Sequence, residues 1–123
     1  MPLVKINMLK GKDSEYKKKV FDCVHSGLID SLGIEDWDRF QRIIEYDKSD
    51  YETAPAKTDN FMIIELTLFP GRTAEQKRKA IELITDRLCS ELGILPTDVF
   101  IVIDEPPFEN WGMGGKQKES PRK

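Results

Sequence analysis

The sequence predicts an α/β (α+β) domain made of two tandem β-α-β repeats, whose strands form one four-stranded sheet with both helices on one face. The first observation is a repeat: the 123-residue sequence, shifted against itself by about 60 positions, gives a gapless match over about three dozen residues. The second is the order of patterns in each matched half, where alternating apolar residues precede a stretch of helical spacing and then an apolar run. Together they indicate a duplicated unit with the order strand, helix, strand.

Residue identities support the repeat along its whole length. About a dozen pairs are identical, whereas unrelated segments of this length share roughly two or three. They fall in the glycine turn, along the helix and in the second strand: Gly11 with Gly71, Leu28 with Leu88, Leu32 with Leu92, Gly33 with Gly93, Ile34 with Ile94, Asp38 with Asp98 and Phe40 with Phe100. A residue in one unit therefore has its equivalent 60 positions away in the other.

Each unit is expected to begin and end with a strand. Alternation predicts the first strands, at Val4, Ile6 and Met8 and, in the second unit, at Ile64, Leu66 and Leu68. The second strands are predicted from the apolar runs 40–44 and 99–103. Because strand–helix–strand crossovers are right-handed and join parallel strands, we expect the two strands of one unit to be parallel.

The helices have start signals, stop signals and one apolar stripe each. Thr73 and Gln76 form a capping box in the second unit, and Asp13 or Ser14 can cap the first helix. Gly33 and Gly93 are expected to end the helices. The stripes consist of Val20, Val24, Leu28 and Leu32 and of Ala80, Ile84, Leu88 and Leu92.

These elements define one domain over 1–123, made of the units 2–46 and 61–106. The polar, Pro55-containing segment 47–60 is the expected linker, and 107–123 is a C-terminal tail that we expect to be mobile beyond its glycines. The helices leave one sheet face uncovered, which carries Leu3, Leu9, Ile63 and Phe69. Exposed apolar surface and open strand edges predict a homo-oligomer.

Composition excludes several classes of protein. With 39% hydrophobic and 33% charged residues the chain is typical of a globular domain. A net charge of −3 disfavours nucleic-acid binding, which needs a concentrated basic face. No apolar run approaches the roughly 20 residues of a membrane span, and the sequence shows no signal-peptide pattern, so we expect no membrane contact and a cytoplasmic protein. Cys23 and Cys89 lack metal-ligand spacing and are interpreted as reduced thiols.

Pro2 is the first candidate for chemistry. Methionine before a small residue is usually removed, which leaves a free secondary amine as the first group of the chain. An α-amine titrates nearer neutrality than a lysine and can accept or donate a proton at working pH. The alternative is that Pro2 merely opens an edge strand, where its missing N–H is harmless.

Three further features are candidates. Arg72 follows Gly71 just before a helix cap, so its cation and the positive end of the helix dipole can together bind a carboxylate. The alternative is that Arg72 is only solvated. Lys12 stands at the same place in the first unit. Asp38 and Arg39 enter a strand in the segment DRFQ, either as site residues or as a salt-bridged strand end. Trp37 and Trp111 are interpreted as core or interface aromatics, and Trp111, in ENWGMGG, can also lie beside a pocket. His25 is interpreted as a structural or surface residue.

The opening MPLVKINMLKGK, the segment PGRTAEQKRKAI and the ending ENWGMGG resemble the tautomerase superfamily from Pro2 to about Gly115, the linker excepted. The resemblance implies a tautomerase (MIF-like) fold of the 4-oxalocrotonate tautomerase type, a homotrimer for two-unit chains, and proton transfer by the N-terminal proline on a small 2-oxo or 2-hydroxy-enoic acid. It makes Pro2 the catalytic proline, Arg72 the carboxylate ligand and Trp111 a pocket wall. DRFQ also resembles DRYQ of malonate semialdehyde decarboxylase, which makes Asp38 an active-site aspartate.

The sequence departs from these relatives at the second arginine. The decarboxylase and the chloroacrylate dehalogenases carry another arginine shortly before the one matched by Arg72, where this chain has Phe69 and Pro70. The second arginine of 4-oxalocrotonate tautomerase falls at Phe40 or Phe100. Arg39 or Lys12 can substitute in binding substrate, with Phe40 beside them.

We therefore expect an isomerase that tautomerises a small carboxylate substrate without a metal or other cofactor. Pro2, Arg72 and Asp38 are its expected catalytic residues, and Arg39, Trp111, Lys12 and Phe40 its expected substrate-binding residues. The alternatives are a cofactor-free decarboxylase or a hydratase-type dehalogenase on the same scaffold, and a non-catalytic trimeric binding protein.

Overall fold

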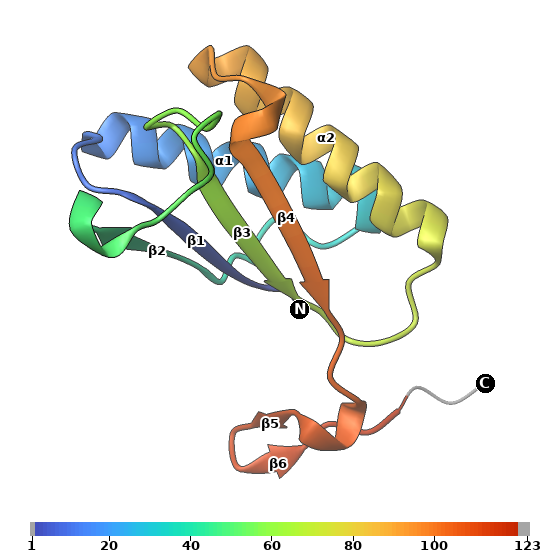
Figure 1. The fold of residues 1–123 in the computed structure, drawn as a ribbon. Helices are drawn as coiled ribbons and strands as arrows, with labels where there is room; N and C mark the ends of the chain where they lie inside the picture. The colour runs from blue at the N-terminus through green and yellow to red at the C-terminus, as the bar shows by residue number, and fades with distance from the viewer. Residues whose placement is uncertain (1, 121–123) are drawn as a thin grey trace.

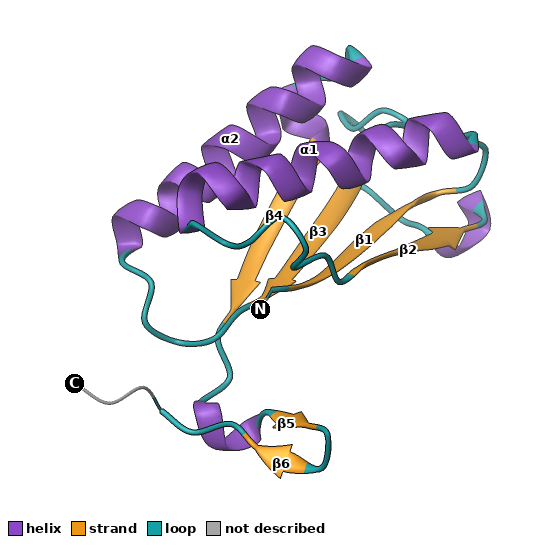
Figure 2. Cartoon of the chain, turned by 180° about the vertical axis from the view of Figure 1, so that it is seen from behind, coloured by secondary structure: helices purple, strands orange, loops and turns teal. Residues whose placement is uncertain are grey.

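A computed structural model describes residues 2–120 of the chain. Met1, whose removal the sequence predicts, and residues 121–123 of the expected tail lie outside the described residues. The chain forms one four-stranded sheet with two helices packed on one face (Figures 1 and 2), as predicted. Among residues 2–120 no helix is long and apolar enough to cross a membrane.

The sheet has the order β2-β1-β3-β4. Its strands are β1 (Leu3–Leu9), β2 (Gln41–Tyr46), β3 (Met62–Thr67) and β4 (Val99–Asp104). β1 pairs parallel with β2 and β3 parallel with β4, as expected for right-handed units, and β1 and β3 join the units antiparallel. β2 lies slightly later than the predicted run 40–44, because its pairing with β1 extends to Leu9 and Tyr46.

The helices α1 (Ser14–Leu32) and α2 (Ala74–Leu92) begin and end at the predicted signals. Asp13 caps α1 by accepting a hydrogen bond from the Tyr16 amide, and Thr73 and Gln76 form the complete capping box of α2. Both helices end at a glycine in the left-handed region, Gly33 with φ 70° and Gly93 with φ 67°. Equal caps at equivalent positions are the structural form of the sequence repeat.

The core lies between the helices and the sheet. It contains the inward residues of β1 and β3 and the predicted helix stripes, of which all but Leu92 are buried; the largest fully buried side chains include Ile6, Leu28, Ile64, Leu66, Ile84 and Leu88. The helices approach closely at Gly27, where an added Cβ would lie 2.7 Å from Ile84 Cγ1. Figure 2 shows the two helices crossing over the strands.

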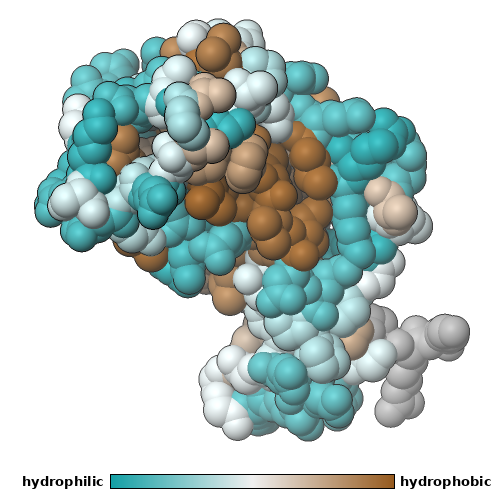
Figure 3. All heavy atoms as spheres, in the orientation of Figure 1, coloured by the Kyte–Doolittle hydropathy of each residue, from teal (hydrophilic) through white to brown (hydrophobic). Residues whose placement is uncertain are grey.

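The opposite sheet face is open, and Figure 1 views it from the front. Phe100 and Val102 of β4 are 48% and 55% exposed there, and Figure 3 shows an apolar patch over β3 and β4. The linker 47–60, which contains the short helix η1 (Lys48–Asp50), covers part of this face, since the Tyr51 hydroxyl donates hydrogen bonds to the carbonyls of Asn7 and Phe61. Trp37 is 72% exposed, so within the chain it is not a core residue.

The predicted tail is folded over much of its length. After the short helix η3 (Phe108–Asn110), the strands β5 (Gly112–Met113) and β6 (Lys116–Gln117) form a hairpin that extends beyond one end of the sheet (Figure 1). Gly114 and Gly115 both have positive φ, 62° and 79°, which is what a two-residue hairpin turn requires. The glycines that we expected to precede a mobile segment therefore turn the chain back on itself.

Candidate active site

The start of β1 lies at the same end of the sheet as two other functional segments. Val4 donates its amide to the Phe40 carbonyl at 2.9 Å, and the register Leu3↔Thr67 places Pro2 next to the end of β3. Pro2 is thus flanked by the DRFQ segment on one side and by the β3–α2 turn that carries Arg72 on the other. Pro2 is buried and precedes a central strand, so the alternative that it opens an edge strand is wrong.

Arg72 lies in the turn between β3 and α2. Gly71, with φ 123°, lets the chain turn from the strand toward the helix, and Thr73 begins the helix directly after Arg72. Arg72 is half-buried, and within residues 2–120 it has no carboxylate partner. A cation without a counter-charge, next to a helix N-terminus, is suited to bind a carboxylate.

An aromatic cluster forms one wall of this end of the sheet. The ring of Trp111 meets Phe69 edge-on at a centroid distance of 4.6 Å, and Phe108 lies 5.7 Å from Phe69. Trp111 is 9% exposed and donates its indole N–H to the Pro106 carbonyl at 3.1 Å. We name Phe69, Phe108 and Trp111 the aromatic wall. Sequence reasoning found Trp111, but it missed Phe108 and placed Phe69 on the open sheet face.

Asp38 is buried at 7% exposure in the segment that leads into β2. Its equivalent Asp98 accepts hydrogen bonds from the amide and hydroxyl of Thr58, at 2.9 and 2.5 Å. Thr58 lies in the segment that leads into β3, just as Pro2 leads into β1. Asp38 itself lies two residues before Phe40, whose carbonyl accepts the hydrogen bond from the Val4 amide at the start of β1.

Arg39 makes its side-chain contact with α1 and not with the other candidate site residues. Its guanidinium donates to the Asp22 carboxylate on α1 at 2.7 Å, so the interpretation of DRFQ as a salt-bridged strand end holds for Arg39. This hydrogen bond, followed by that from Lys18, lowers the pKa of Asp22. Phe40, the neighbouring candidate, lies directly before β2 and is 44% exposed.

Lys12 lies at the opposite end of β1 from Pro2. Its ammonium group donates to the Asn60 side-chain oxygen at 2.7 Å and lies 5.0 Å from the centre of the Tyr16 ring. Seven strand residues separate the two ends of β1, a distance of about 20 Å. Within one chain, Lys12 and Pro2 therefore do not share a site.

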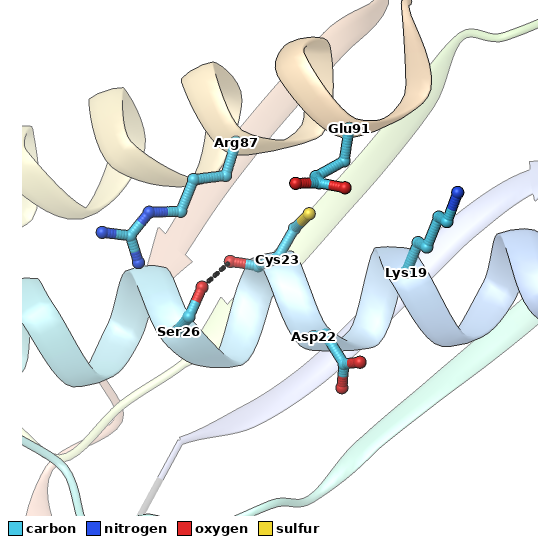
Figure 4. A pocket seen from close by; sticks show the side chains of 6 residues that line it. All are labelled: Lys19, Asp22, Cys23, Ser26, Arg87 and Glu91. Carbon is cyan, nitrogen blue, oxygen red and sulfur yellow. Dashed lines mark hydrogen bonds between the residues drawn. The ribbon is translucent and has the colours of Figure 1, made fainter.

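A cavity of about 350 Å³ lies away from the predicted residues, between α1 and α2. Figure 4 shows that Arg87 and Glu91 come from α2 and that Lys19, Asp22, Cys23 and Ser26 come from α1. Burial, followed by the nearby charges of Glu91 and Asp22, raises the pKa of the Cys23 thiol, so this thiol is not an activated nucleophile. Among residues 2–120 no three His, Cys, Asp or Glu side chains gather as a metal site.

The first comparison, with family models, finds matches over nearly the whole chain. Residues 38–114 match one family model and residues 2–53 match a second, and both are described as a tautomerase enzyme. Among curated proteins, the chain is similar to the probable tautomerase YusQ of Bacillus subtilis, with 33% identity over 93% of this chain and 94% of that protein.

Solved structures are also similar to this chain. An FG41 malonate semialdehyde decarboxylase, solved with 3-bromopropiolate as inhibitor, superimposes with a TM-score of 0.82 at 31% identity and covers 91% of this chain and 88% of that one. A native fused 4-OT superimposes with a TM-score of 0.84 over 94% of both chains. At 21% identity this second likeness concerns the fold alone.

Proposed function

Because the chain belongs to the tautomerase family of enzymes, we propose that it is an isomerase that moves a proton between oxygen and carbon of a small 2-hydroxy-enoic or 2-oxo acid. Pro2, freed by removal of Met1, is the proton-transferring group. The observation that carries the proposal is the meeting of Pro2, the Arg72 turn and the aromatic wall at one end of the sheet.

The reaction that suits this site is ketonisation of an enol next to a carboxylate. The neutral Pro2 amine accepts the enol hydroxyl proton, the O–H electron pair forms the carbonyl, and the C=C electron pair takes the proton back at carbon. Arg72 binds the carboxylate and lowers the energy of the enolate charge. The apolar aromatic wall disfavours the charged form of the amine, which keeps it ready to accept a proton.

The test is the ultraviolet decay of 2-hydroxymuconate or phenylenolpyruvate, with wild type beside Pro2→Ala and Arg72→Ala. We expect losses in kcat/KM of about 10²–10⁴-fold for Pro2→Ala and about 10²-fold for Arg72→Ala. Lys79→Ala, which removes an exposed cation of α2, is the matched control and keeps full activity. Unchanged activity of Pro2→Ala, or an N-terminal mass that retains Met1, would contradict the proposal.

A second candidate is decarboxylation of a 3-oxo acid, favoured by the 31% identity to a malonate semialdehyde decarboxylase and by Asp38 in the DRFQ segment. In malonate semialdehyde the bond between the methylene and carboxylate carbons would break, and its electron pair would form an enolate. Protonation of that carbon gives acetaldehyde, and the carboxylate leaves as CO₂. Acetaldehyde formation, followed through NADH consumption with alcohol dehydrogenase, in excess of enol ketonisation would make this candidate the leading one.

We also propose that the active form is a homotrimer, assembled through the open sheet face. The exposed apolar residues Phe100 and Val102 support this surface, since a monomer would leave them in water. If Lys12 binds substrate, it does so in the site of a neighbouring subunit, because its own Pro2 lies at the other end of β1.

A further inference from the structure

The C-terminal hairpin returns a lysine to the aromatic wall. β5 and β6 pair antiparallel with Gly112 opposite Gln117, and one step further the Lys118 amide donates to the Trp111 carbonyl at 2.9 Å. The Gln117 side chain donates to the Glu109 carbonyl in η3 at 2.8 Å. These hydrogen bonds hold residues 117 and 118 against the segment that carries Trp111.

The Lys118 ammonium lies over the ring of Phe69, with Nζ 5.5 Å from the ring centre. Phe69 is the residue that Trp111 meets edge-on, so this cation lies on the aromatic wall. The face of an aromatic ring attracts a cation. It carries no negative charge, however, and an ammonium group has three N–H donors to offer. The charge of Lys118 is therefore placed by the wall but not neutralised by it.

The other lysines that lie over aromatic rings have further partners. Among residues 2–120 these are Lys12 and Lys57. The Lys12 ammonium donates to the Asn60 side-chain oxygen at 2.7 Å, and the Lys57 ammonium donates to the Thr97 carbonyl at 2.7 Å. Within the same described residues, the Lys118 ammonium has neither a hydrogen-bond acceptor nor a carboxylate partner. Its donors are available to an anion from outside the chain.

Arg72 is a second cation of this region without a counter-charge. It follows Phe69 by three positions, in the turn that begins next to Pro2, and none of residues 2–120 supplies a carboxylate to it. Lys77 of α2, by contrast, pairs with Glu105. The turn 69–72 therefore has two uncompensated positive charges, one in its own sequence and one placed on it by the tail.

The two cations that the sequence offered as companions of Arg72 are engaged elsewhere. Arg39 donates to Asp22 on α1, and Lys12 lies at the opposite end of β1 from Pro2. Within one chain, neither of them reaches the turn that carries Arg72. Lys118 does reach it, through the ring of Phe69.

We infer that Lys118 is a specificity-determining residue that binds a second carboxylate of the substrate, while Arg72 binds the carboxylate next to the reacting carbon. A lysine recognises a carboxylate by charge and by its N–H donors, and at an exposed position it can be reached from solvent. The inference deepens the proposed function and rests on it, since it makes the preferred substrate a dicarboxylate.

Ketonisation of two enols tests the inference, because 2-hydroxymuconate has two carboxylates and phenylenolpyruvate has one. We expect Lys118→Met to raise KM for 2-hydroxymuconate about ten-fold and to leave KM for phenylenolpyruvate unchanged. The value of kcat should stay near that of wild type, because a carboxylate far from the reacting atoms is bound equally in the ground state and the transition state.

Three variants serve as controls for charge and position. Lys118→Arg keeps the cation and should keep the low KM for 2-hydroxymuconate, whereas Lys118→Glu reverses the charge at an exposed position and should raise this KM above that of Lys118→Met. Lys116→Met removes another exposed lysine of the same hairpin and should change neither KM. Equal changes for both enols in Lys118→Met, or a wild-type KM for 2-hydroxymuconate in Lys118→Glu, overturns the inference.

Binding without turnover separates this inference from the proposed function. Isothermal titration calorimetry compares adipate, which has two carboxylates, with hexanoate, which has one on a chain of the same length. We expect wild type to bind adipate about ten-fold more tightly than hexanoate and Lys118→Met to bind both alike. This result in a protein that turns over neither enol would reject the isomerase and keep the second carboxylate site. Turnover lost in Pro2→Ala, together with equal adipate affinity in wild type and Lys118→Met, would keep the isomerase and reject the role of Lys118.

Discussion

Comparison of the two units helps to distinguish residues that maintain the fold from residues that are candidates for function. Lys17 pairs with Glu45 at 3.0 Å, and their equivalents Lys77 and Glu105 form the same pair in the second unit. A contact that is present in both units belongs to the fold. Pro2 and His25 have the equivalents Met62 and Thr85, so at these positions the chemistry is present in one copy only, whereas Arg72 and its equivalent Lys12 are both cations. Internal duplication thus helps to distinguish fold residues from site candidates, and Asp38 and Phe40 are candidates that both units share.

The Asp22–Arg39 pair leads to a pH-dependent prediction. Because Arg39 and then Lys18 lower the pKa of Asp22 below its ordinary value of 3.8, the pair stabilises the fold above that pH and loses this contribution as the pH falls further. The Arg39 side chain is 42% exposed and that of Asp22 is 48% exposed, so Arg39→Met should lower the free energy of unfolding at pH 7 by only about 0.5 kcal/mol.

Urea unfolding at pH 7 and at pH 2.5 measures this difference. We expect wild type and Arg39→Met to converge at the lower pH, while Lys79→Met, at an exposed position of α2, differs little from wild type at either pH. A gap between wild type and Arg39→Met that stays constant with pH would mean that the pair does not contribute through its charge.

Elements were predicted better than the site they position. Helix caps, glycine stops and apolar periodicity are local signals, and they located both helices and all four sheet strands to within about two residues. The hairpin β5–β6 was missed, because two glycines are equally typical of a tight turn and of a mobile tail. The aromatic wall and the hydrogen bond from Arg39 to Asp22 on α1 join residues from different elements, and no local pattern reveals such contacts.

The crossing of α1 and α2 at Gly27 gives a prediction at this scale. A Cβ there would lie 2.7 Å from Ile84 Cγ1 and 3.3 Å from the Ile84 amide nitrogen, so Gly27→Ala requires the helices to shift. The overpacking costs about 1–3 kcal/mol, and the better helix propensity of alanine offsets about 1 kcal/mol of it.

Thermal and urea unfolding should therefore show Gly27→Ala to be less stable than wild type by about 1 kcal/mol. Gly112→Ala is the matched control, since its Cβ would meet no atom within 4 Å and its φ is not positive. A Gly27→Ala variant more stable than wild type would show that the helices separate at little cost.

At the scale of the whole molecule, the two faces of the sheet have different surroundings. One face is covered by α1 and α2, whereas the other leaves Phe100 and Val102 exposed beside the part that the linker covers (Figure 3). Charges also lie on this face, since Lys5 is in register with Arg42 and Glu65 across the neighbouring strands. Aromatic and other apolar residues with polar residues around them are typical of surfaces that join subunits.

The oligomer prediction compares the same substitution on both faces. If the open face joins subunits, light scattering at micromolar concentration gives three times the chain mass of 14.2 kDa for wild type, and Val102→Lys lowers it, because a buried lysine without a partner is costly. Ile81→Lys places the same charge at a 39% exposed apolar position of α2 and should leave the mass unchanged. The reverse result, with Ile81→Lys dissociating the protein and Val102→Lys not, would move the interface to the helices. It would also exclude the open face as the route by which Lys12 reaches a neighbouring site.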